Sequence, residues 1–363
     1  MNPICDIIVL TFNRLDITKQ FVESFLANTI LPTRLIIIDN ASSDATRQYL
    51  SGLRGTDNCA IEVILNDDNV GFVRGMNQGI ALSRAPFVCL SNNDLIFTRG
   101  WLGQIISVFD KDDRIGLLNP NSNNLGVHPK TKDDMDKLAV DLGSKHKQEF
   151  VEMPFCVGFC MVIKREVIDK VAGLSDEFFP MFFEDTDYSM KVKAAGYLIG
   201  AARASYVYHL EHASLKQIGS KKEQFFIASR DKYDKKWGKI LRIAWIVNDC
   251  QDLALVLRQA IEVSRQGNYV WIFIRNKIDR KTAFKEAGLY EHSVVNFVNF
   301  GSIFGLLWLI LKKKKRYDII IGSSKFTKCI FSGLGYNIWE KADFSEISRI
   351  RHKKDFCAAG IKD

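Results

Sequence analysis

The chain alternates short, continuous apolar runs with longer stretches in which apolar residues recur every three or four positions. The runs are rich in β-branched residues, as buried parallel strands are: Cys5–Thr11, Arg34–Asp39, Ile61–Leu65 and Pro86–Ser91. Helical spacing separates them, over residues 17–29, after residue 44 and over residues 74–83. Strand and helix in alternation with short connections predict a mostly parallel α/β sheet with right-handed crossovers.

The same alternation starts again after Gly238 and Lys239. Strand-like runs cover residues 241–248, 269–274, 293–298 and 317–322, and helical patterns cover residues 253–265 and 302–316. We therefore expect one α/β domain at residues 1–239 and a smaller, Rossmann-like α/β domain at residues 240–363. Residues 119–148 are polar and poorly periodic, which predicts a long loop over the active face.

Composition and charge limit the number of domains and the kinds of partner that we expect. With 363 residues, 47% apolar and 25% charged, the chain has the balance of a globular protein of about two domains. The net charge is +8, and its densest cationic run, residues 312–316, ends a predicted helix. Cations suit a helix C-terminus, so we expect a solvated helix end and no nucleic-acid partner.

Cysteine usage and apolar segments bear on location. The eight cysteines form no CxxC pair, and residues 1–6 do not read as a signal peptide, so we expect reduced thiols and a cytoplasmic protein. The apolar segment Phe297–Leu311 is too short to span a bilayer, which leaves peripheral contact with the inner face of a membrane open.

Polar clusters follow each predicted strand of the first half. They are Thr11–Asn13, Asp39–Asp44, Asn69–Gly71 and Asn92–Asp94. One such cluster would be an ordinary turn, because Asn, Asp, Ser and Gly dominate turns. Ligands of open α/β sheets bind at the carboxyl ends of strands, so four clusters at one edge predict a binding site.

A further segment, residues 178–197, carries candidate catalytic groups. Four phenylalanines, at positions 178, 179, 182 and 183, run into Glu184, Asp185 and Asp187, and an amphipathic helix ending at Gly196 follows. Carboxylates in a first helical turn are favoured by the helix dipole alone. Carboxylates held against apolar surface instead acquire a raised pKa, in the range of a general base. Both interpretations stand at this point.

Taken in order, these segments resemble the inverting family 2 glycosyltransferases of the GT-A fold, especially bacterial polysaccharide and rhamnosyl-type transferases. The resemblance covers about residues 4–237 and rests on residues 9–13, 38–44, 69–77, 90–94, 100–101, 158–161, 183–187 and 209. The second half resembles the opening half of a GT-B glycosyltransferase and stops before a nucleotide-sugar half. It is expected to act as a docking or acceptor-guiding module, and a truncated longer protein is equally compatible.

The resemblance implies roles for individual residues. Thr11, Asn13 and Asp39 are expected to hold the nucleoside. Other donor contacts implied are Asn69, Gly71, Arg74, Asn93 and Gly158. Arg74 lies near a predicted helix N-terminus, where it suits a diphosphate, and a solvated surface arginine is the equal alternative. Asp185 matches the general base, with Glu184 and Asp187 as supporting catalytic residues.

The metal motif departs from the family pattern. Where the family has Asp-X-Asp, this chain has Asn92-Asn93-Asp94. Asp94 is still expected to bind Mg²⁺ or Mn²⁺ through oxygen, and His209 resembles the histidine that completes the site. His212 is not assigned a role. The departure leaves the metal preference open.

The prediction is therefore an inverting glycosyltransferase. It would move a sugar from a nucleotide-diphosphate sugar to a glycan or lipid-linked glycan acceptor in surface polysaccharide synthesis. Two alternatives are a non-catalytic sugar-nucleotide-binding scaffold, which Asn92 encourages, and a nucleotidyltransferase. The latter needs a Gly-rich loop after the first strand, and residues 11–15 contain no glycine.

Overall fold

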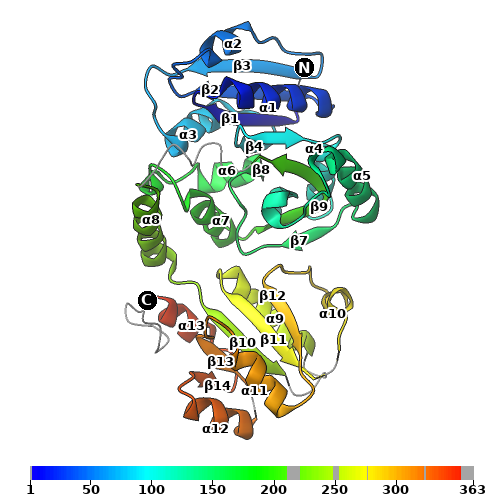
Figure 1. The fold of residues 1–363 in the computed structure, drawn as a ribbon, viewed down its shortest axis with the longest axis vertical. Helices are drawn as coiled ribbons and strands as arrows, with labels where there is room; N and C mark the ends of the chain where they lie inside the picture. Colours follow the sequence, from blue (N-terminus) through cyan, green and yellow to red (C-terminus); the bar gives the residue numbers. More distant parts are fainter. Residues whose placement is uncertain (1, 211–220, 248–252, 276, 323, 353–363) are drawn as a thin grey trace. The chain divides into compact units, whose positions relative to one another are not determined.

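The computed structural model describes residues 2–210, 221–247, 253–275, 277–322 and 324–352 (Figure 1). The chain divides into two compact units. The first comprises Met1–Phe150 and Phe155–Lys232, and the second comprises Val151–Pro154 and Tyr233–Asp363. The division after Lys232 falls inside helix α8 (Lys221–Trp237).

A nine-stranded sheet forms the centre of the first unit. Its order is β3 (Cys59–Leu65), β2 (Thr33–Asp39), β1 (Cys5–Thr11), β4 (Phe87–Ser91), β8 (Cys160–Lys164), β6 (Ile115–Asn121), β9 (Leu198–His209) and β5 (Leu95–Phe97), with β7 (Phe150–Glu152) paired to β9. The first four strands are parallel, as the apolar runs predict, and β8 is antiparallel to both β4 and β6. The predicted α/β architecture with a mostly parallel sheet is confirmed.

Helices cover both faces of this sheet. Helices α3 (Phe72–Leu82), α6 (Arg165–Val171) and α7 (Glu184–Ala194) bury apolar residues in one cluster with β1, β2 and β4. Helices α1 (Leu15–Asn28) and α4 (Trp101–Phe109) join the aromatic group of Phe21, Phe25, Phe97 and Trp101. The short helix α2 (Thr46–Gly52) follows β2.

The predicted long loop at residues 119–148 is wrong. The segment holds the end of β6, two single 3₁₀ turns and helix α5 (Met135–Lys145). Helix α5 carries Met135, Leu138 and Leu142 at helical spacing, but only Leu142 is fully buried. Polar residues flank this short pattern on both sides, which is why it does not stand out in the sequence.

The second unit is a doubly wound, all-parallel sheet, and the Rossmann-like prediction for it is confirmed. Its order is β12 (Val295–Asn299), β11 (Tyr269–Ile274), β10 (Arg242–Val247), β13 (Ile319–Ile321) and β14 (Ile338–Trp339). Helices α9 (Leu253–Arg265), α10 (Arg280–Glu286) and α13 (Phe344–Arg351) pack on one face. Helices α11 (Ile303–Leu311) and α12 (Lys325–Gly333) pack on the other.

The short segment Val151–Pro154 belongs to this second unit although it lies far upstream in the sequence. The Glu152 amide donates to the Glu291 carbonyl at 2.8 Å, and the Ser293 amide donates to the Glu152 carbonyl at 2.8 Å. The buried Glu152 carboxylate accepts hydrogen bonds from Arg265 Nε at 2.6 Å and Nη2 at 3.1 Å. Among the described residues, none of the helices has the length and apolarity needed to cross a bilayer.

Candidate functional site

The carboxyl ends of β1 and β2 bring Thr11 and Asp39 together. The two residues are partners in the parallel register, and Thr11 Oγ1 donates to Asp39 Oδ1 at 3.1 Å. The backbone amide of Ser42 donates to Asp39 Oδ2 at 3.0 Å. Asp39 is wholly buried. Its carboxylate is held by Ser42 of its own loop and by Thr11 of the neighbouring strand.

Asn13 joins the loops that follow these two strands. Its backbone adopts a left-handed φ of 56°, which asparagine tolerates better than most residues. Its amide donates to Ser42 Oγ at 2.7 Å, and its side-chain oxygen accepts from the Ser43 amide at 2.8 Å. The predicted nucleoside residues Thr11, Asn13 and Asp39 therefore form one connected network.

The loop after β3 reaches the same edge of the sheet. Asn40 Nδ2 donates to the Gly71 carbonyl at 3.3 Å, and Asn69 Oδ1 accepts from the Gly71 amide at 2.9 Å. Gly71 has a φ of 79°, and a Cβ atom there would lie 2.7 Å from Phe179 Cε2. The backbone conformation favours glycine at this position, and a side chain there would also push the Phe179 ring aside.

Arg74, in the first turn of α3, pairs with Asp176. The guanidinium donates through Nε at 2.9 Å and Nη2 at 3.0 Å to the two carboxylate oxygens. Its carbon lies 4.6 Å from the centre of the Phe179 ring. Arg74 therefore contacts the segment that precedes α7, and its role at a diphosphate stays a prediction.

The end of β4 leads into the predicted metal residues. Ser91 lies opposite Cys160 at the start of β8, and the Asn92 amide donates to the Phe159 carbonyl at 2.9 Å. Asn92 and Asn93 are half-buried, whereas Asp94 is buried. The chain beyond β4 therefore lies against the loop that carries Gly158.

Asp94 and His209 meet across the antiparallel strands β5 and β9. His209 Nε2 lies 3.0 Å from Asp94 Oδ1, and the imidazole stacks on Phe159 with 5.7 Å between ring centres. A carboxylate oxygen beside an imidazole nitrogen fits two positions in the shell of a divalent cation such as Mn²⁺. Across the described ranges, no group of three or more His, Cys, Asp or Glu side chains gathers as a metal site. Residue 212 lies outside the described residues.

Asp185 occupies the second position of α7. Its Oδ2 accepts from the Gly158 amide at 2.8 Å, and its Oδ1 accepts from the Thr186 amide at 2.6 Å and from Thr186 Oγ1 at 3.1 Å. Burial raises the pKa of Asp185 above its ordinary value, and these hydrogen bonds act in the opposite direction. The carboxylate is fixed in orientation and is a stronger proton acceptor than a solvated aspartate.

Glu184 is the second carboxyl group at the start of α7. Burial, and then the charge of the adjacent Asp185, raise the pKa of Glu184 to about 8. Glu184 Oε2 is shielded from solvent and has no hydrogen-bond partner. Both carboxyl groups at the start of α7 therefore bind a proton more strongly than solvated carboxyl groups do.

Asp187 has a different environment from these two. It is wholly buried, and its Oδ2 accepts from Ser175 Oγ at 2.6 Å. This bond ties the first turn of α7 to the segment before it, so Asp187 fits the supporting role better than direct contact with an acceptor.

The four phenylalanines before α7 do not form one apolar wall. Phe178 is buried, and Phe179 lies beneath Arg74. Phe182 and Phe183 both adopt left-handed φ values and contact Phe226 of α8, with ring centres 5.7 and 5.4 Å apart. Burial raises the pKa values of Glu184 and Asp185 as predicted, and a contact that covers Asp185 comes from the backbone at Gly158.

Asn119 is a positioning residue that sequence reasoning missed. Its Nδ2 donates to the carbonyls of Val157 and Cys160 at 2.9 and 2.6 Å, and its Oδ1 accepts from the Val157 amide at 2.8 Å. It therefore holds the loop that carries Gly158 and Phe159. The only available signal was a polar residue ending the apolar run of β6.

The chain is similar in sequence and in fold to known proteins. Residues 6–172 match the family model for glycosyl transferase family 2. An uncharacterised protein of Sinorhizobium fredii is 26% identical over 232 residues, covering 58% of this chain but only 25% of that protein, so the chain spans about a quarter of that relative. The N-acetylglucosaminyl-diphospho-decaprenol L-rhamnosyltransferase of Mycobacterium tuberculosis is 21% identical over 305 residues, covering 73% of this chain and 97% of the relative.

Among solved structures, GalNAc-T7 with UDP, GalNAc and Mn²⁺ has a TM-score of 0.50 and 13% identity. The match covers 80% of this chain and 55% of that one. At this identity the likeness is one of fold.

Proposed function

We propose that this chain, a family 2 glycosyltransferase of the GT-A fold, transfers a sugar with inversion from a nucleoside-diphosphate sugar to a glycan or lipid-linked glycan. One observation carries the proposal. Gly158 and Phe159 are consecutive, and they contact Asp185 and His209 respectively, with Asp94 beside His209. A candidate base and candidate diphosphate-binding groups are thus gathered around one loop.

Asp185 is proposed as the general base. It would accept the proton of an acceptor hydroxyl while the hydroxyl oxygen bonds to the anomeric carbon and the bond to the diphosphate breaks. A single displacement of this kind inverts the anomeric centre. Support comes from the three hydrogen bonds that fix the carboxylate and from its raised pKa.

Glu184 is proposed to support Asp185 by staying protonated. At adjacent positions, the negative charge of one carboxylate makes ionisation of the other less favourable. With the proton on Glu184, Asp185 keeps its negative charge at neutral pH, so the two residues take different roles in the same site.

The donor nucleotide is proposed to bind at the ends of β1, β2 and β3. Thr11, Asn13 and Asp39 would hold the nucleoside, and Asn69, Gly71 and Asn93 would line its path toward Gly158. Support comes from the hydrogen-bonded network that already joins these loops. Arg74 is proposed to leave Asp176 and contact the diphosphate when donor is bound.

Asp94 and His209 are proposed to hold a divalent cation, Mg²⁺ or Mn²⁺. Bound there with the diphosphate, such an ion neutralises charge on the leaving group. Asp94 supplies an oxygen ligand and His209 a nitrogen ligand, and the donor's own oxygens would fill other positions. GalNAc-T7 was solved with Mn²⁺, which is consistent with the proposal.

A lipid-linked glycan is the favoured acceptor. The Mycobacterium tuberculosis relative is named for rhamnosyl transfer to N-acetylglucosaminyl-diphospho-decaprenol, and by analogy this chain would act in surface polysaccharide synthesis. We propose a cytoplasmic setting on the cysteine usage of the sequence, which contains no CxxC pair.

A panel of nucleotide sugars tests the proposal. Raised thermal stability with one donor identifies a ligand of the native state. Incubation of that donor with lipid-linked glycans should then release nucleoside diphosphate, and NMR of the product should reveal inverted anomeric configuration. In a separate assay, formation of a nucleotide sugar from a nucleoside triphosphate and a sugar 1-phosphate, with release of pyrophosphate, would instead indicate a nucleotidyltransferase. Donor binding without turnover on any acceptor would indicate a sugar-nucleotide-binding scaffold.

A further inference from the structure

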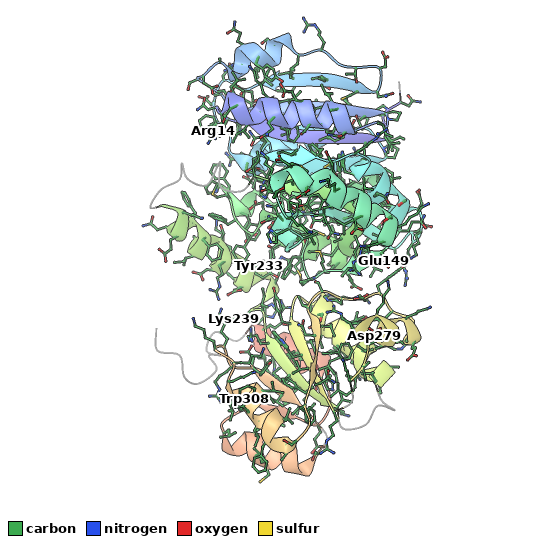
Figure 2. The ribbon with its side chains drawn as sticks, turned by 45° about the vertical axis from the view of Figure 1, so that its right-hand side comes forward. Arg14, Glu149, Tyr233, Lys239, Asp279 and Trp308 are labelled. Carbon is green, nitrogen blue, oxygen red and sulfur yellow. The ribbon has the colours of Figure 1, made fainter. Side chains whose placement is uncertain are left out.

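Helix α11 of the second unit exposes three large apolar side chains. Phe304, Trp308 and Leu311 are 79%, 62% and 50% exposed, and Trp308 is labelled in Figure 2. Their spacing of four and three residues places them on one face of the helix. The opposite face carries Leu306 and Ile310, each 1% exposed within the core. The helix is therefore already packed on its sheet, and the exposed face is a second apolar surface.

Cations adjoin this apolar face directly. Residues 312–316 are four lysines and an arginine, and Lys312, Lys314 and Lys315 are exposed. Lys312 Nζ lies 3.6 Å from the centre of the Trp308 ring, so apolar and cationic groups are contiguous. No Asp or Glu occurs between Glu291 and Asp318. We call Phe304, Trp308, Leu311, Lys312, Lys314 and Lys315 the α11 surface.

The end of the cationic run is anchored. Arg316 stacks on Tyr336 at 4.2 Å and donates to the Leu334 carbonyl at 2.9 Å. Leu334 is itself 43% exposed. The run is therefore tied to the folded unit at both ends, through Trp308 and through Tyr336.

The chemistry of this surface favours one occupant over others. A second copy would bring an equal set of cations against the first, and like charges repel. A bilayer with anionic lipids satisfies both parts of the surface. Tryptophan suits the headgroup level, phenylalanine and leucine suit the acyl boundary, and lysines keep their ammonium groups among the anionic headgroups.

The length of α11 decides how it would lie. Nine residues of helix extend about 14 Å, whereas the hydrocarbon core of a bilayer is about 30 Å thick. The helix cannot cross, so it would lie in the plane of the interface with its exposed face inward.

We propose that the α11 surface docks the second unit on the surface of a bilayer that contains anionic lipids. This inference is independent of the chemistry proposed for the first unit. It also changes the interpretation of the cationic run, which becomes part of a binding surface as well as a solvated helix end.

Co-sedimentation of the full chain with vesicles tests the proposal. One set of vesicles is phosphatidylcholine alone, and the other is an equimolar mixture of phosphatidylcholine and phosphatidylglycerol. We expect binding to the mixed vesicles only, and its loss at high salt, because salt screens attraction at the surface. The double variant Phe304→Ser/Trp308→Ser and the triple variant Lys312→Gln/Lys314→Gln/Lys315→Gln should each weaken binding by about tenfold or more.

Matched controls distinguish the loss of the α11 surface from the loss of any exposed apolar side chain or any exposed lysine in the second unit. Leu255→Ser removes an apolar side chain that is 57% exposed on α9. The variant Lys281→Gln/Lys285→Gln/Lys341→Gln removes three exposed charges from elsewhere in the same unit. Both should bind as the unaltered chain does. Thermal unfolding identifies any variant that fails to fold. If the double variant Phe304→Ser/Trp308→Ser fails to fold, the single variant Trp308→Ser is tested in its place.

Several results would overturn the proposal. They are full binding by either α11 variant, equal binding to the two kinds of vesicle, or no binding to the mixed vesicles. If sedimentation instead reveals a dimer that Trp308→Ser dissociates, without binding to vesicles, a second copy is the occupant and the membrane assignment is wrong.

Discussion

The backbone amide of Gly158 donates a hydrogen bond of 2.8 Å to Oδ2 of Asp185. A Cβ atom on residue 158 would lie 3.3 Å from that same oxygen, so glycine gives the carboxylate room at this bond. The next residue, Phe159, stacks on His209. This short loop therefore couples the position of α7 to the end of β9, and the predictions about catalysis start from it.

We expect Asp185→Asn to lower the rate of transfer by about 10²–10⁴, the usual contribution of a general base. The amide keeps the shape of the carboxylate but cannot accept the proton, so donor binding should stay close to that of the unaltered chain. Steady-state kinetics and donor titration measure the two effects separately.

In this variant the new side-chain NH₂ group would face the backbone N–H of Gly158 or of Thr186. Two donors cannot form a hydrogen bond with each other, so the variant could lose stability and a control is needed. Thermal unfolding measures that local cost. Asp136→Asn, which changes an exposed aspartate in the first turn of α5, should alter neither rate nor stability. If Asp185→Asn retains activity within a few fold, the base is a different group.

Glu184→Gln should change the dependence of stability on pH. The folded-state pKa of Glu184 is raised from 4.5 to about 8 by burial and by Asp185. Between those values the folded state binds the proton more strongly than the unfolded state, so the free energy of unfolding falls as pH rises through this window. Glutamine carries no titrating proton, so the variant should lose less stability over the same range.

Thermal unfolding of both proteins across that pH range makes the comparison. Because protonated Glu184 and glutamine are both neutral, the variant should keep most of its activity at neutral pH, unlike Asp185→Asn. Parallel stability curves for the two proteins would mean that Glu184 titrates as an ordinary glutamate.

Chelation with EDTA should abolish transfer, and added Mn²⁺ or Mg²⁺ should restore it. Asp94→Ala is expected to remove metal-supported donor binding, whereas His209→Ala should weaken it less, because Asp94 and the diphosphate still hold the ion. Electron paramagnetic resonance in the presence of nucleoside diphosphate measures the affinity of each variant for Mn²⁺ without requiring turnover.

The exposed His128 offers a matched control, since His128→Ala should leave Mn²⁺ binding unchanged. Turnover that is insensitive to chelation would instead mean that Asn92, in place of the family's first aspartate, marks a metal-independent enzyme.

The pair Arg74 and Asp176 distinguishes two roles for the arginine. If Arg74 moves to the diphosphate, Arg74→Met should weaken donor binding by about tenfold, and Asp176→Asn should leave it unchanged or stronger by freeing the guanidinium. If the arginine only anchors the segment before α7, the two variants should have the same effect. Isothermal titration with donor decides between these outcomes.

The buried Glu152 makes a prediction about stability. Arg265→Met would leave its carboxylate without a cation, and we expect the free energy of unfolding to fall by about 2–3 kcal/mol, below the range for fully buried pairs because Arg265 is partly exposed. Glu152→Gln should cost less, since the amide can still accept a hydrogen bond.

Chemical denaturation measures both changes. Arg349→Met, which breaks an exposed pair with Glu346 on α13, should have little effect. If Arg265→Met is equally mild, the segment Val151–Pro154 does not need its ion pair to stay in the second unit.

The sequence by itself determined the four parallel strands β1 to β4 of the first sheet, the strands β10 to β13 of the second, and the sheet edge where the candidate site lies. The run Cys5–Thr11 is β1, the run Tyr269–Ile274 is β11, and the pattern at Leu253–Arg265 is α9. Each has a local cause, because continuous β-branched runs or a helical apolar stripe are needed to bury that segment on its sheet. Asn, Asp and Gly at the strand ends likewise report turn chemistry that short segments encode.

The tertiary structure alone decided which distant groups meet. Arg74 pairs with Asp176 across 102 positions, and Glu152 pairs with Arg265 across 113. Asn119 holds the loop at Gly158, and that loop holds Asp185. These contacts depend on how helices and strands pack. The sequence around a single charged or amide side chain has no pattern from which its distant partner could be predicted. Helix α5 escaped notice for a different reason, because its apolar pattern is short and lies between polar flanks.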